Sequence, residues 1–121
     1  MVVVDSSGWI EFFTAGPKAN AYAQYLKKPE EVLTPVVVLY EVYKKIKRER
    51  GEEMAKLCLA QIEKTRVVPI EEGIALLAAD LSLESSLPMA DAFVLATARM
   101  HKTRVVTSAA DFRGISGAEV L

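Results

Sequence analysis

Cysteine and histidine are scarce in this chain, and each shortage excludes a class of functional site. Cys58 is the only cysteine and His101 the only histidine. A lone cysteine excludes an internal disulfide framework and a Cys-rich zinc site. A lone histidine argues against a zinc site and against a Ser-His-Asp triad. We therefore expect a reducing cytoplasm, a core position for Cys58, and a role for His101 at a helix C-terminus.

The chain also lacks an excess of either charge and any long apolar run. Lys plus Arg number 15 and Asp plus Glu 16, so a nucleic-acid partner must be argued from a local patch. No stretch approaches the roughly 20 apolar residues that span a bilayer. A basic, then apolar, signal peptide is not expected either. With no repeats or linkers, we expect one domain over residues 1–121 and no membrane association.

Short runs of β-branched residues alternate with helical patterns along the chain. Strands are predicted at 2–4, 32–33, 66–70, 103–107 and, as an edge strand, 118–121. Amphipathic helices are predicted at 18–27, 35–50, 52–64, 71–85 and 89–100. Thr34 has the character of an N-cap, whereas 6–13 is mixed and 108–117 has the character of a loop or short turn. Strands that are joined through helices predict an α/β fold with a parallel sheet.

Two helices carry stripes of apolar residues that we expect to face the core. For the helix 35–50 the predicted stripe is Val36, Leu39, Val42, Tyr43 and Ile46. For the helix 52–64 it is Met54, Leu57, Cys58 and Ile62. The buried character of the strand at 66–70 is predicted from its apolar run.

Four acidic residues stand out because of their surroundings. Their positions are the end of the first strand, an apolar stretch of a helix, the first turn of the most apolar helix, and the segment after the strand 103–107: Asp5, Glu41, Asp91 and Asp111. Open α/β sheets bind ligands outside the carboxyl ends of their strands. Carboxylates that meet there stay ionised only beside a cation, and hard oxygen ligands select Mg²⁺ or Mn²⁺. Such a site suits in-line displacement at phosphorus.

Each of these features has a plainer alternative. Asp5 could cap a following turn or helix, and Asp91 could interact with a helix dipole. Glu41 is followed by a basic run at helical spacing, so it could be an exposed ion-pair partner. The run itself could be a solvated helix face, or it could track phosphates beside the acidic site through Lys44, Lys45 and Arg48.

Four segments, in order, resemble the signature blocks of PIN domains, and most of all those of the VapC toxins of toxin–antitoxin pairs. They are 3–7, 34–42, 90–98 and 105–112. The resemblance implies a three-layer α/β/α sandwich with a central parallel sheet. It also implies an Mg²⁺- or Mn²⁺-dependent endoribonuclease, an RNA substrate, a cognate antitoxin and a homodimer. Carried over, the metal ligands are Asp5, Glu41 and Asp91, the further catalytic acid is Asp111, and the supporting hydroxyls are Ser6 and Thr107.

The fourth segment departs from the family pattern at one position. Many relatives place Asp or Asn two residues after the Thr, and Ala109 stands there. Asp111 could supply the fourth acid, or the site could work with three. A catalytically impaired PIN-like module that binds RNA or protein is therefore the alternative function. A haloacid-type phosphatase would need an acid where Ser7 stands, and a receiver domain would need a paired acid near Asp5.

A homodimer is also predicted from aromatic residues near the N-terminus. Aromatic side chains favour interfaces. The chain has more of them here than a small core needs, in Trp9, Phe12, Phe13 and Tyr22.

Overall fold

A five-stranded parallel sheet forms the centre of the computed structural model, which describes all of residues 1–121. The strands are β1 (Val2–Val4), β2 (Val32–Pro35), β3 (Arg66–Val68), β4 (Arg104–Thr107) and β5 (Ala118–Val120), in the order β3-β2-β1-β4-β5. Every neighbouring pair is parallel. The predicted α/β fold with a central parallel sheet is confirmed.

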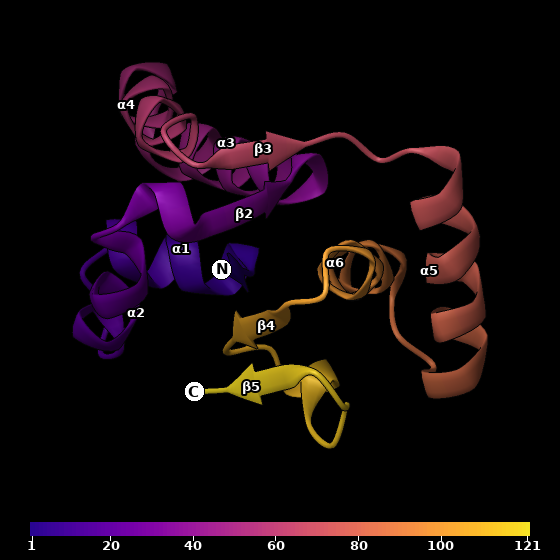
Figure 1. The fold of residues 1–121 in the computed structure, drawn as a ribbon. Helices are drawn as coiled ribbons and strands as arrows, with labels where there is room; N and C mark the ends of the chain where they lie inside the picture. Colours follow the sequence, from indigo (N-terminus) through magenta and orange to yellow (C-terminus); the bar gives the residue numbers. More distant parts are fainter.

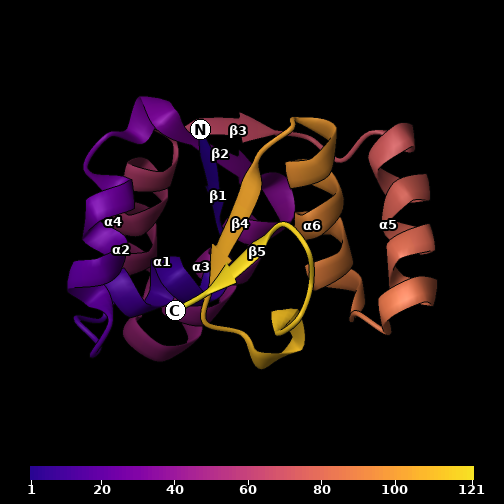
Figure 2. The same ribbon diagram turned by 60° about the horizontal axis from the view of Figure 1, so that its bottom comes forward.

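Six α-helices cover the two faces of this sheet. They are α1 (Ser6–Phe13), α2 (Ala19–Leu26), α3 (Val36–Arg50), α4 (Glu52–Ile62), α5 (Glu72–Ser85) and α6 (Met89–Met100). Short 3₁₀ turns occur at η1 (Pro29–Glu31) and η2 (Ala110–Phe112). Helices α1, α2 and α4 lie on one side of the strands, α6 lies on the other with α5 outside it, and α3 runs from the end of β2 back to α4 (Figures 1 and 2). None of the helices is long and apolar enough to span a membrane.

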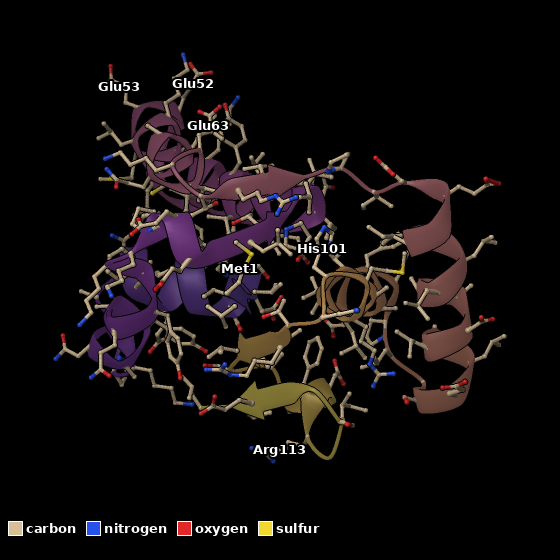
Figure 3. All side chains as sticks on the ribbon, viewed as in Figure 1. Met1, Glu52, Glu53, Glu63, His101 and Arg113 are labelled. Atoms are coloured by element: carbon tan, nitrogen blue, oxygen red, sulfur yellow. The ribbon has the colours of Figure 1, made fainter.

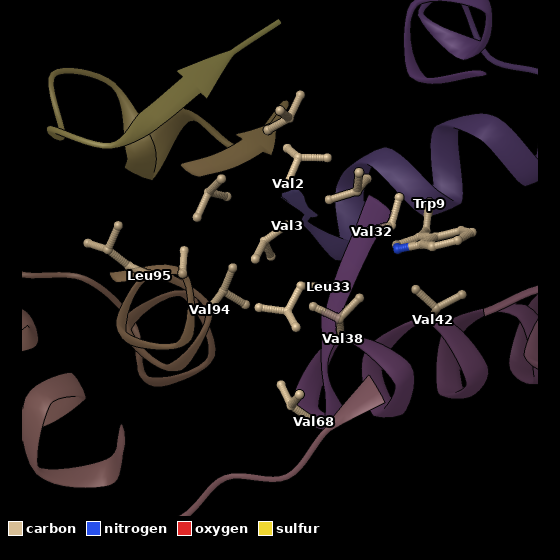
Figure 4. Close-up of a cluster of buried hydrophobic side chains, with 14 of the residues drawn as sticks. Val2, Val3, Trp9, Val32, Leu33, Val38, Val42, Val68, Val94 and Leu95 are labelled. Atoms are coloured by element: carbon tan, nitrogen blue, oxygen red, sulfur yellow. The ribbon is translucent and has the colours of Figure 1, made fainter. Parts of the chain in front are cut away.

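The core lies on both faces of the three inner strands, β2, β1 and β4. The fully buried Val3 and Leu33 lie toward Val94 of α6, and Val32 lies on the other face, toward Trp9 of α1 (Figure 4). The position of β1 between β2 and β4 explains its run of three valines, because a strand buried on both faces needs apolar residues at every position. Cys58 is buried in the same core, as predicted.

Two local predictions at helix starts are wrong. Residues 6–13 form α1, although their pattern is mixed; the helix is short and buries only Gly8 and Trp9. Thr34 does not cap α3, since it is the third residue of β2 and its Oγ1 lies 2.6 Å from Oγ1 of Thr65. The β-branched Thr34 fits a strand, and its buried hydroxyl is already hydrogen-bonded to Thr65, so it is not available to cap the helix.

The predicted inward faces of α3 and α4 are each partly wrong. Val38, Val42 and Ile46 are the buried residues of α3, whereas Val36 is exposed. In α4 the residues Met54 and Leu57 are exposed, and the buried ones are Ala55, Cys58 and Ile62. The acidic residues around α4 project outward at Glu52, Glu53 and Glu63 (Figure 3). Helix α4 packs mainly on α3, which covers only a narrow stripe of each helix.

Position in the sheet explains one further difference from the predictions. Strand β3 is an edge strand, and Arg66 and Val67 are exposed, so it is not the fully buried strand that was predicted.

Trp9 and Tyr22 are buried within one copy of the chain, which leaves only Phe12 and Phe13 of the four aromatic residues partly exposed. His101 follows α6, with Nδ1 3.0 Å from the carbonyl oxygen of Thr97, which confirms its position at a helix C-terminus.

Candidate active site

Asp5 lies at the carboxyl edge of the sheet, between the end of β1 and the start of α1. The neighbouring strand β4 pairs Val106 with Val4, so Thr107 follows at the same edge. The Thr107 hydroxyl donates a hydrogen bond of 2.9 Å to Oδ2 of Asp5, and the Ser7 hydroxyl donates one of 3.3 Å to the same oxygen. Asp5 occupies the N-cap position of α1, as the capping alternative expected, but its side chain makes no hydrogen bond with capping geometry to the helix.

A second layer of hydrogen bonds holds the Ser7 and Thr107 hydroxyls. The N–H of Ser108 donates to Oγ of Ser7 (3.0 Å), and the N–H of Ala109 donates to Oγ1 of Thr107 (2.9 Å). Behind them the hydroxyl of Tyr22, from α2, lies 2.6 Å from Oγ of Ser108. The carboxylate of Asp5 is therefore positioned by three segments of the chain that are far apart in sequence.

Three of the acidic residues singled out in the sequence line one pocket of about 540 Å³: Asp5, Glu41 and Asp91. They come from the end of β1, the second turn of α3 and the first turn of α6. The same pocket is lined by Ser6 and Ser7 and by the predicted basic residues Lys44, Lys45 and Arg48. We refer to it below as the acidic pocket.

Like charge and burial together perturb the acids of this pocket. Burial, together with the charges of Asp5, Asp111 and Glu41, raises the pKa of Asp91 from its ordinary value of 3.8 to about 7. Burial raises the pKa of Glu41, and the charge of Asp5 adds to the rise. Burial also raises the pKa of Asp5, against the hydrogen bond from Thr107. Carboxylates arranged in this way need a cation if they are to be ionised together.

The donor set of the acidic pocket fits a hard divalent cation. Oδ1 of Asp5 is shielded from solvent and has no hydrogen-bond partner, which is costly for a carboxylate oxygen unless a cation or another donor reaches it. All the available donors are carboxylate and hydroxyl oxygens, which suit Mg²⁺ or Mn²⁺. No three of the acidic side chains are gathered closely enough in this structure to form a complete ligand set around one ion.

The position at which the family pattern has an acid is occupied by Ala109, and the nearest acid in this segment is Asp111. Ala109 lines the acidic pocket, whereas Asp111 is exposed and lies beyond its lining. Phe112, the next residue, is fully buried in η2. The Asp111 carboxyl group nevertheless reaches Asp91, because its charge and a hydrogen bond between the two side chains both raise the pKa of Asp91.

The basic run divides into paired and unpaired residues. Lys45 forms an ion pair with Glu49 (3.1 Å) and Lys47 forms one with Glu52 (3.4 Å). Lys44 and Arg48 pair with no carboxylate. Glu41 pairs with no cation, so the surface ion-pair alternative for Glu41 is not realised.

Sequence reasoning missed Ser7, Tyr22 and Tyr40 as contributors to this region. Ser7 could have been found, because it follows Asp5 by two residues and a hydroxyl there can reach the carboxylate. Tyr22 has no local signal, since it is one apolar position in a helical pattern.

A family model described as PIN domain matches residues 2–118. This chain belongs to the PIN domain family. The predicted resemblance is thereby confirmed, and the three-layer arrangement around a parallel sheet is the one expected for such a domain.

Solved structures with the same fold come from toxin–antitoxin proteins. A toxin–antitoxin complex from Klebsiella pneumoniae has 23% identity and a TM-score of 0.83, with 99% of this chain and 97% of that chain covered. VapC20 of Mycobacterium tuberculosis, titled a Sarcin-Ricin loop cleaving toxin, has 22% identity and a TM-score of 0.82, with 99% and 98% covered. VapBC2 of Rickettsia felis, bound to promoter DNA, has 13% identity and a TM-score of 0.79, with 100% and 98% covered. A comparison with curated proteins gives no match.

Proposed function

We propose that this PIN domain is an endoribonuclease that depends on Mg²⁺ or Mn²⁺ and acts as the toxin of a toxin–antitoxin pair. The observation that carries the proposal is the meeting of Asp5, Glu41 and Asp91 in one pocket that unpaired cations also line. Similarity of fold to toxin–antitoxin proteins supports the toxin role.

The residues of the acidic pocket have distinct roles in this proposal. Asp5, Glu41 and Asp91 hold the cation, and Thr107 and Ser7 fix the orientation of Asp5 through their hydrogen bonds. Ser6 acts as a supporting hydroxyl beside Glu41, where its hydrogen bond lowers the pKa of that carboxyl. A bound divalent cation would supply charge neutralisation at the phosphate and lower the pKa of an attacking water.

Lys44 and Arg48 attract the phosphates of the RNA, with Lys45 contributing when its bond to Glu49 opens. Asp111 is the further catalytic acid: its charge and its hydrogen bond to Asp91 raise the pKa of that carboxyl. With Ala109 at the family's fourth position, three acids hold the cation.

The test is cleavage of a mixed RNA pool by the purified protein with Mn²⁺ and with EDTA. We expect cleavage that requires Mn²⁺ in the parent and none with Asp5→Asn. Asp80→Asn is the matched control, because Asp80 is exposed on α5 away from the acidic pocket. Cleavage that survives in EDTA, or in Asp5→Asn, would contradict the proposal.

A catalytically impaired module that binds RNA or protein is the second candidate. The alanine at position 109 and the absence of a ready-made three-acid cluster favour it. Calorimetric titration with Mn²⁺ separates the two functions: the impaired module binds RNA and no cation, whereas the enzyme binds both.

The proposed assembly is a cytoplasmic homodimer in complex with a cognate antitoxin protein. Structures of toxins with their antitoxins, including VapBC from Salmonella typhimurium bound to DNA, share the fold and support this assembly. Phe12 and Phe13 remain partly exposed and are available to an interface. Sedimentation over a range of concentrations tests the dimer, and a monomer at every concentration would contradict it.

A further inference from the structure

A second, apolar groove adjoins the acidic pocket along α3. It has a volume of about 560 Å³, and its apolar part is formed by Val36, Leu39, Tyr40 and Tyr43. Tyr40, Lys44 and Arg48 line both the groove and the acidic pocket. Because these three are spaced four residues apart on one helix, they form a ridge that separates the two hollows. A flexible ligand in the acidic pocket can therefore continue into the groove over this ridge.

The ridge presents an aromatic ring beside a positive charge. Tyr40 is 58% exposed, so its ring is accessible to a ligand. Nζ of Lys44 lies 5.4 Å from the centroid of this ring and donates a hydrogen bond of 3.3 Å to its hydroxyl. Exposed aromatic rings next to cations are the surfaces on which single-stranded nucleic acids stack their bases while their phosphates are neutralised.

The distribution of ion pairs along α3 favours a polyanion as the occupant. Lys45 and Lys47 are neutralised by Glu49 and Glu52, whereas Lys44 and Arg48 have no acidic partner. Arg50 at the end of the helix is also unpaired but lines neither hollow, whereas Lys44 and Arg48 line both. An apolar protein segment would gain from Leu39 and Tyr43 but would leave these charges unmatched.

We infer that the groove of Val36, Leu39, Tyr40 and Tyr43 is a nucleobase subsite of the RNA substrate. The nucleotide next to the scissile phosphate stacks its base on Tyr40 and packs against Leu39, and its phosphate lies between Lys44 and Arg48. A volume of about 560 Å³ accommodates one nucleotide. This inference rests on the proposed RNA substrate and adds which part of the strand is bound outside the acidic pocket.

The experiment measures the affinity of a fluorescent single-stranded RNA for four proteins in buffer without divalent cations. We expect Tyr40→Ala to weaken binding about 5–100-fold, the range for loss of one stacked base. Tyr40→Phe retains the ring and should stay within about twofold of the parent. Tyr25→Ala is the matched control, because Tyr25 also lies beside a cation, Arg104 at 5.9 Å, but lines neither hollow.

RNAs with a single abasic nucleotide at successive positions locate the base. One position should weaken binding to the parent as much as Tyr40→Ala does, and Tyr40→Ala should lose nothing further with that RNA. Equal RNA affinity of the parent and Tyr40→Ala, with Mn²⁺-dependent cleavage intact, would overturn the inference and leave the proposed function standing. A parent that neither binds nor cleaves RNA would overturn both.

A protein occupant has its own signature in the same set of variants. If Tyr40→Ala retains RNA affinity but converts a dimer into a monomer in sedimentation, the groove is an interface between copies and not a base subsite. Because Tyr40 is exposed, its substitution should leave the melting temperature close to that of the parent, and Tyr40→Phe provides a second folded variant.

Discussion

Gly8 of α1 and Tyr22 of α2 share one space: a Cβ atom on Gly8 would lie 2.3 Å from Cε1 of Tyr22. The same atom would lie 2.8 Å from Cγ1 of Val4, which is fully buried. The absence of a side chain at Gly8 therefore allows the Tyr22 ring to pass under α1. Its hydroxyl then reaches Ser108, whose N–H bonds to Ser7 beside Asp5.

Gly8→Ala should destabilise the protein, although alanine is the better helix former by about 1 kcal/mol. Neither the buried Tyr22 ring nor Val4 can move aside, and overpacking of this kind costs about 1–3 kcal/mol. Urea denaturation measures the effect. Gly73→Ala in α5 is the control, because its added Cβ would meet only Cε of Met100 at 3.7 Å, and it should not lower the midpoint. An unchanged midpoint for Gly8→Ala would show that the shared space is not tight.

Tyr22→Phe should weaken Mn²⁺ binding without unfolding the protein. It retains the buried ring but removes the hydroxyl 2.6 Å from Oγ of Ser108, which is connected to Asp5 through three hydrogen bonds by way of Ser108 and Ser7. Thr107→Val removes a direct hydrogen bond to Asp5 and should cost about 10–100-fold in affinity for the ion. For Tyr22→Phe we expect about 2–10-fold, less than for a direct partner. Equal Mn²⁺ affinities in calorimetric titration of Tyr22→Phe and the parent would separate this tyrosine from the site.

The sequence predicted the strands and most helices because their apolar patterns reflect local burial. Asp5, Glu41 and Asp91 could be found because an acid in an apolar stretch is costly without a partner. Tyr22 and Tyr40 could not be found from the sequence. Packing against distant segments decides that Tyr22 is buried and Tyr40 is exposed. The same applies to the contact of Asp111 with Asp91, which joins two segments that are 20 residues apart in sequence.

Because the pKa of Asp91 is raised in the folded state, the metal-free protein should become less stable as pH rises. The carboxyl holds its proton up to about pH 7 in the folded chain, but only to its ordinary 3.8 when unfolded. Between these values the folded state binds more protons, so the free energy of unfolding falls from the lower pH to the higher. Burial and the neighbouring acids cause the shift, so Asp91→Asn should remove this part of the pH dependence.

Melting temperatures in EDTA at pH 5 and pH 8 check this expectation. Asp91→Asn should melt several degrees above the parent at pH 8, with a smaller gain at pH 5. Addition of Mn²⁺ should raise the melting temperature of the parent and leave the variant unchanged, and RNA cleavage should be lost in the variant. If Asp91 only served the helix dipole, the variant would instead lose about 0.5–1 kcal/mol of stability and retain any cleavage.

Ala109→Asp should supply the acid that the family pattern places at this position. Ala109 lines the acidic pocket, and its N–H already bonds to Thr107, so a carboxylate there would face the other three acids. Without metal the added charge should lower the melting temperature, because four carboxylates repel more than three. With Mn²⁺ the order should reverse, since the extra ligand should tighten ion binding about tenfold. Ala110→Asp, one residue further and exposed, controls for added charge and should change neither quantity. A variant Ala109→Asp that is destabilised equally with and without Mn²⁺ would mean that position 109 does not face the ion.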